Sequence, residues 1–156
     1  MTWQTTSQSA EETAALAKKL APLLRGNEVI ELRSDVGGGK TTFTKGLVAA
    51  LGSTNHVASP SFTVSKEYKT AHGRVVHFDF YRLQDPGTVA DALAEESLDD
   101  TTLTIVEWAD TVEHVLPANR IIITLDRTAE GEDARKISLT VPSDRSDIIR
   151  GMSGEA

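Results

Sequence analysis

Residues 34–42, Ser-Asp-Val-Gly-Gly-Gly-Lys-Thr-Thr, decide the fold expected for this chain. They lie between a predicted strand over residues 28–33 and a predicted helix with Phe43, Leu47 and Leu51 on one face. A glycine-rich turn in this position brings backbone N–H groups close to an anion, and the dipole of the following helix favours the same negative charge. The stretch therefore predicts a phosphate-binding loop (P-loop) in an α/β domain.

The end of the P-loop pattern G-x-x-x-x-G-K-[ST] is present at Gly39, Lys40 and Thr41, whereas Ser34 stands where the first glycine belongs. Lys40 would supply a positive charge to the β- and γ-phosphates, and the Thr41 hydroxyl would bind magnesium. The residues expected to contact the nucleotide are Asp35, Val36, Gly37, Gly38, Gly39, Lys40, Thr41 and Thr42.

Two acidic residues stand at the ends of later predicted strands, where a P-loop protein needs a carboxylate for its magnesium ion. Glu107 closes the apolar run 103–106, and Asp79 follows the run 75–78. Alternation along the strand places Asp79 on the same face as His77, which we interpret as a strand residue with a hydrogen-bond partner. We expect the Asp79 strand to lie one position further from the loop than the Glu107 strand.

The rest of the chain predicts helices and strands that interleave early, followed by strands. Ser9 and Glu12 form a capping box for a first helix that Pro22 should kink or shorten. The fold class expected is α/β, a single three-layer P-loop domain over residues 1–142 with a mixed central sheet and flanking helices. Residues 143–156 are expected to be a tail, a short helix or disordered. The other predicted elements are a hairpin over 62–80, a helix from Asp85-Pro86, a strand over 102–108 and a second hairpin from strands 120–125 and 136–141.

Composition excludes several classes of protein. The 156 residues carry a net charge of -7, which disfavours broad, sequence-independent binding of nucleic acid. The chain has no cysteine, so disulfides and thiolate metal sites are excluded, and its four histidines lack the spacing of zinc ligands. The longest apolar run, Leu47–Leu51, is too short for a membrane span, and Met1–Ser9 does not resemble a signal peptide. We therefore expect a cytoplasmic protein.

Four sequence blocks in order resemble the TsaE family, the small bacterial P-loop ATPases required for threonylcarbamoyladenosine (t6A37) modification of tRNA. The first is the P-loop at residues 34–42, and the second is Ser59-Pro60-Ser61-Phe62. The other two, which are more specific than a P-loop, are His-x-Asp-x-Tyr-Arg-Leu over residues 77–83 and Val-Glu-Trp over residues 106–108. The similarity spans roughly residues 9–141.

The resemblance implies an ATPase that is weak alone, is stimulated by a complex of TsaD and TsaB, and reaches tRNA only through that complex. It implies ATP and Mg²⁺ as cofactors, with Lys40 on the phosphates and Thr41 and Glu107 on the metal. Asp79 would act near the γ-phosphate, and Trp108 would lie beside the nucleotide.

Two alternatives remain beside this interpretation. A small P-loop kinase would need an arginine-bearing lid, for which residues 126–135 with Arg127 and Arg135 are a candidate, although this segment fits a hairpin loop better. A nucleotide-dependent switch would bind ATP and dock a partner without useful turnover. A GTPase is excluded because the chain has no N-K-x-D guanine signature.

Overall fold

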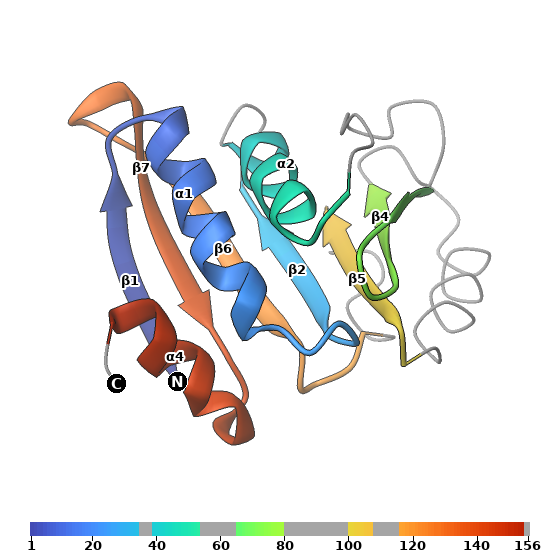
Figure 1. Ribbon diagram of the computed structural model, residues 1–156. Helices are drawn as coiled ribbons and strands as arrows, with labels where there is room; N and C mark the ends of the chain where they lie inside the picture. The colour runs from blue at the N-terminus through green and yellow to red at the C-terminus, as the bar shows by residue number, and fades with distance from the viewer. Residues whose placement is uncertain (35–38, 54–64, 80–99, 108–115, 155–156) are drawn as a thin grey trace.

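The structure, a computed structural model, describes residues 1–34, 39–53, 65–79, 100–107 and 116–154. These residues contain a seven-stranded sheet in the order β1-β7-β6-β2-β5-β4-β3 (Figure 1). The strands are β1 (Thr2–Ser7), β2 (Val29–Arg33), β3 (Ser65–Lys69), β4 (Arg74–Asp79), β5 (Thr102–Glu107), β6 (Ile121–Thr128) and β7 (Gly131–Thr140).

The centre of the sheet is parallel and both margins are antiparallel. Strand β2 pairs in parallel with β5 and with β6, and β4 pairs in parallel with β5. Strand β3 pairs antiparallel with β4, and β7 pairs antiparallel with both β6 and β1. The sheet is thus mixed and flanked by helices, which confirms the α/β class, and the carboxyl ends of β2, β4, β5 and β6 meet at one edge.

The helical elements are α1 (Ala10–Leu20), η1 (Ala21–Leu23), α2 (Lys40–Ala50), η4 (Ser143–Arg145) and α4 (Ser146–Ser153). The predicted cap of α1 is confirmed, since the Ser9 hydroxyl accepts the Glu12 N–H at 3.1 Å. Pro22 acts as expected, because the α-helix ends at Leu20 and continues only as a 3-10 turn. No helix of the described residues is long and apolar enough to cross a membrane.

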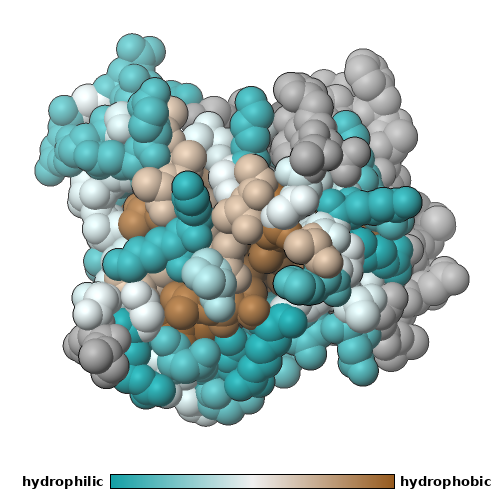
Figure 2. All heavy atoms as spheres, in the orientation of Figure 1, coloured by the Kyte–Doolittle hydropathy of each residue, from teal (hydrophilic) through white to brown (hydrophobic). Residues whose placement is uncertain are grey.

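A core lies between the sheet and helices α1, α2 and α4, and these helices share one face of the sheet (Figure 1). Ile30, Leu32 and Ile105 from the central strands pack with Phe43 and Leu47 of α2. Figure 2 shows that the apolar atoms of this face gather toward its centre, with hydrophilic atoms around the margins. On the opposite side of the sheet, where alternation places them, Val76, Phe78 and Val106 are also buried. The helix predicted from Asp85-Pro86 lies outside the described residues.

The N-terminal end of the chain forms a strand that the sequence interpretation did not include, and the C-terminal end forms a short helix, one of the alternatives expected for residues 143–156. Residues 2–7 form edge strand β1, although only a polar N-terminal segment was expected. Beyond Pro142, helix α4 buries Ile148 and Met152 in the common core and packs against α1 and β1. Arg145 anchors this segment, since its guanidinium bonds Glu28 at 2.7 Å and the Leu23 carbonyl at 2.8 Å.

Candidate functional site

The glycine-rich turn joins β2 to α2, as the sequence predicts. Strand β2 ends at Arg33, and α2 begins at Lys40 directly after Gly39, whose φ of 103° lies in the left-handed region that favours glycine. Among the described residues, no side chain caps this end of α2. The first-turn N–H groups and the positive end of the helix dipole lie directly after Gly39, which is the kind of helix start that binds phosphate. Asp35, Val36, Gly37 and Gly38 lie outside the described residues.

Lys40 is held against the beginning of the turn. Its Nζ donates a hydrogen bond to the Ser34 carbonyl at 3.0 Å, and its side chain is buried. This contact holds the ammonium group beside Ser34, the residue at which the predicted phosphate-binding loop begins. Thr41 is exposed at the helix start and Thr42 is half-buried, so both lie on the first turn of α2.

The two predicted acids lie side by side at the carboxyl edge of the sheet. Asp79 and Glu107 are register partners in the parallel pair β4–β5, and Glu107 is also the register partner of Leu32 on β2. The strand order β2-β5-β4 confirms that Asp79 lies one strand further from the P-loop than Glu107. Leu32 is only two residues before Ser34, so Glu107 lies one strand spacing from the strand that leads into the loop.

Sequence reasoning gave His77 a hydrogen-bond partner but did not identify which group stands beside it. His77 Nε2 lies 3.3 Å from Glu107 Oε2, and the two side chains are 1% and 3% exposed. The geometry of this contact falls short of a hydrogen bond, and neither ring nitrogen has a hydrogen-bond partner among the described residues, so the predicted partner of His77 is not found there. Alternation along β4 predicts that His77 and Asp79 share one face of the sheet. The neighbour of His77 on β5 depends on the register between the two strands, which the sequence of one strand does not determine.

The Glu107 carboxylate has the features of a magnesium ligand. Its Oε1 is buried without a hydrogen-bond partner in the described part of the chain. A buried carboxylate oxygen with no partner is costly, and a cation offsets that cost. Magnesium is commonly bound by one or two carboxylates together with phosphates and water. The described residues contain no group of three or more metal-binding side chains, as a closed protein cage would need. Glu107 therefore fits a magnesium ion that is shared with a phosphate ligand.

Arg135, on strand β7, lies close to the last glycine of the turn. The ladder between β6 and β7 continues to Thr128 and Gly131, so most of segment 126–135 is strand. This confirms that the segment belongs to a hairpin, as expected, and is not the lid that a kinase would need. In this position Arg135 Nε lies 3.9 Å from where a Cβ on Gly39 would stand.

Trp108, the remaining predicted site residue, lies outside the described residues.

Comparison with known proteins decides the family. The model for "Threonylcarbamoyl adenosine biosynthesis protein TsaE" matches residues 7–137. The tRNA threonylcarbamoyladenosine biosynthesis protein TsaE of Bacillus subtilis (strain 168) is 37% identical over 147 residues, covering 94% of this chain and 89% of the relative. The chain belongs to the TsaE family. The TsaE protein of Rickettsia bellii is 36% identical over 123 residues, covering 78% of this chain and 85% of its own.

A solved structure agrees with this assignment. The crystal structure of Bacillus subtilis YdiB matches with a TM-score of 0.82 and 32% sequence identity, covering 99% of this chain and 95% of that chain. The TsaE resemblance drawn from the sequence motifs is thus confirmed. The TsaE match includes β2, α2, β4 and β5, which carry Lys40, Asp79 and Glu107.

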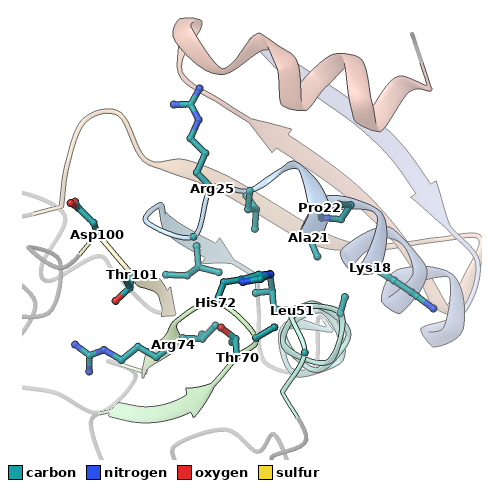
Figure 3. Close-up of a pocket in the computed structure, with 17 residues that line it drawn as sticks. Lys18, Ala21, Pro22, Arg25, Leu51, Thr70, His72, Arg74, Asp100 and Thr101 are labelled. Carbon is teal, nitrogen blue, oxygen red and sulfur yellow. The ribbon is translucent and has the colours of Figure 1, made fainter.

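A separate pocket lies at the opposite end of this TsaE domain (Figure 3). Its volume is about 580 Å³, and apolar lining residues include Ala21, Leu51 and Leu103. Figure 3 shows the charged ends of Lys18 and Arg25 pointing away from it. The pocket borders the last turn of α2 and the beginning of β5, whereas Lys40 and Glu107 stand at the other ends of these elements. An α-helix of eleven residues is about 16 Å long, so the pocket is not part of the loop site.

Proposed function

We propose that this protein is an ATP-binding P-loop ATPase that supports the t6A37 modification of tRNA by acting on the TsaB–TsaD transferase complex. We further propose that it works in the cytoplasm, hydrolyses ATP weakly alone, is stimulated by the complex and reaches tRNA only through it. Membership of the TsaE family supports the pathway, because the relatives are named for the biosynthesis of threonylcarbamoyladenosine in tRNA.

The observation that supports the ATPase proposal is the buried Oε1 of Glu107, which has no hydrogen-bond partner among the described residues and belongs to the strand next to β2, the strand before the glycine-rich turn. A carboxylate buried without a counter-ion destabilises the fold. If Glu107 served only to fill space in the core, an apolar side chain of the same size would stabilise the protein more. Its position next to β2, together with Lys40 at the start of α2, is what magnesium-dependent phosphate binding requires.

Each site residue receives a role on this proposal. Lys40 and the turn bind the phosphates, and Thr41 and Glu107 hold the magnesium ion, which supplies charge neutralisation on the phosphate oxygens. Asp79 orients the attacking water from the neighbouring strand. The remaining residues assigned to the nucleotide are Asp35, Val36, Gly37, Gly38, Gly39, Thr42 and Trp108.

The first experiment concerns Lys40 and measures ATP affinity by calorimetry for the wild type and Lys40→Ala. Loss of the charge held by the Ser34 carbonyl should weaken ATP binding at least tenfold, about 1.4 kcal/mol. Lys45→Ala, on an exposed face of the same helix, is the matched control and should leave the affinity unchanged. Equal affinities for Lys40→Ala and wild type would contradict the P-loop assignment.

The second experiment separates the two carboxylates. A metal ligand sets the affinity for the magnesium–nucleotide complex, whereas a residue that orients water acts mainly on turnover. Glu107→Gln should therefore lose the magnesium dependence of ATP binding, and Asp79→Asn should keep it while losing hydrolysis stimulated by TsaB and TsaD. The opposite pattern would exchange the two roles. If wild-type protein bound ATP but showed no turnover with the complex, the chain would be a nucleotide switch.

A further inference from the structure

His77 stands in an unusual environment for a titratable side chain. It lies in the middle of parallel strand β4, is fully buried, and has no hydrogen-bond partner for either ring nitrogen among the described residues. Its register partner on β5 is Ile105, an apolar core residue. A buried polar ring without hydrogen bonds is costly, so an apolar residue would serve the core better at this position.

Among the described residues, the polar group that lies beside this ring is the carboxylate of Glu107. Nε2 lies 3.3 Å from Oε2, while Oε1 of the same carboxylate has no partner in the described part of the chain. The imidazole therefore stands beside one oxygen and leaves the other available. Groups that contact a metal ligand in this way fix its orientation, and their loss is felt in metal affinity.

We propose that His77 is a positioning residue for the magnesium–nucleotide site, with its Nε2–H directed at Oε2 of Glu107 so that Oε1 is presented to the ion. This inference rests on the proposed function, because it assumes that Glu107 binds magnesium. The ring must carry a proton on Nε2, and it does not itself touch the nucleotide. On this proposal, we expect the contact to shorten into a hydrogen bond when the ion is bound.

The experiment compares three substitutions of His77 by titrating Mg²⁺ at a fixed concentration of ATP and recording ATP binding. His77→Leu removes the donor, and His77→Asn carries an amide that is too short to reach Glu107. Both should raise the half-saturating Mg²⁺ concentration by about 10- to 100-fold. His77→Gln places an amide N–H at nearly the position of Nε2 and should restore most of the magnesium affinity. ATP affinity measured in chelator should be the same for all three variants and the wild type.

Thr104→Val is the matched control. Thr104 is also buried on β5 with an unpartnered hydroxyl, but alternation places it on the face opposite Glu107. Its replacement removes a buried polar group without affecting the carboxylate, so the magnesium titration should match the wild type. Thermal unfolding of every variant separates loss of fold from loss of the ion.

A measurement on the wild type covers the case in which the variants do not fold. The ¹⁵N resonance of His77 Nε2 should shift when Mg²⁺ is added to the ADP-bound protein and should not shift when chelator replaces the metal. An unchanged resonance would overturn the proposal. The proposal would also be overturned if His77→Leu lost ATP binding equally with and without magnesium. The same holds if a folded His77→Gln did not recover magnesium affinity. If ATP binding by the wild type did not depend on magnesium, the proposed function itself would be contradicted, independently of the role of His77.

Discussion

Replacement of Arg145 by methionine should strongly destabilise the protein, although this residue is far from the P-loop. The Arg145 guanidinium and the Glu28 carboxylate form an ion pair at 2.7 Å, with side chains 7% and 8% exposed. The same guanidinium donates to the Leu23 carbonyl at 2.8 Å. Methionine keeps the apolar stem and removes these bonds, which leaves a buried carboxylate without its counter-ion.

The magnitude follows from what remains around Glu28. Breaking a buried ion pair from one side costs about 3–5 kcal/mol. Glu28 keeps three backbone donors, from Arg25, Gly26 and Asn27, at distances of 2.7–3.1 Å, so its charge is still partly compensated. We therefore expect the lower end, about 3 kcal/mol, which includes the lost donor on Leu23.

Urea denaturation measures this change directly. With a slope of about 1–3 kcal/mol per molar urea, the midpoint should fall by roughly 1–3 M with little change of slope. Arg150→Met is the matched control: Arg150 lies on α4, directly after the 3-10 turn η4 that carries Arg145, and it is exposed and donates to the Ser146 hydroxyl at 3.2 Å. It should stay within about 0.5 kcal/mol of the wild type. A loss below about 1 kcal/mol for Arg145→Met would refute the reasoning that this ion pair anchors the C-terminal segment.

Two further predictions concern acid stability and helix packing. Burial raises the pKa of Glu28, but the Arg145 guanidinium and backbone N–H groups outweigh it and hold that pKa below 4.5. The ionised Glu28 therefore stabilises the fold fully above pH 4.5, and this stabilisation is lost as the pH falls through the lowered pKa. In thermal unfolding between pH 3 and 7, the difference in melting temperature between wild type and Arg145→Met should become smaller as the pH falls. Gly46→Ala should cost about 1–3 kcal/mol net, since the new Cβ would lie 2.8 Å from the Ala14 carbonyl oxygen of α1. Gly131→Ala, with its nearest atom 3.9 Å away, should be close to neutral in the same melts, and equal melting temperatures for the two alanines would contradict the packing argument.

The sequence predicts those parts of the fold that depend on local pattern. The Ser9 cap, the break at Pro22 and the strand–turn–helix around Gly39 each follow from the chemistry of neighbouring residues, and all three are confirmed. Strand β5 is also predicted almost to its ends, because it is rich in apolar and β-branched residues, as expected for a strand buried on both faces.

The missed elements depend on contacts between distant parts of the chain. Strand β1 reads as a polar segment because only Trp3 offers an apolar side chain of any size, and its strand character comes from pairing with β7. Residues 126–135 are interpreted as loop for the same reason, whereas the ladder between β6 and β7 continues through them at Arg127 and Arg135. Contact between His77 and Glu107 depends on the register of two strands, which neither strand specifies alone.

Strand β1 also sets an order for assembly. Thr2 pairs with Thr140, so β1 binds β7, a strand that follows all the other strands of the sheet in the sequence. This pairing must wait until β7 has been synthesised, because closing a loop of this length comes after the local contacts have formed. The helices and parallel strands that carry Lys40 and Glu107 lie wholly between these two strands in the sequence. During synthesis, the nucleotide half of the sheet should therefore fold while the polar N-terminal strand is still unpaired, and β1 should close the edge of the sheet last.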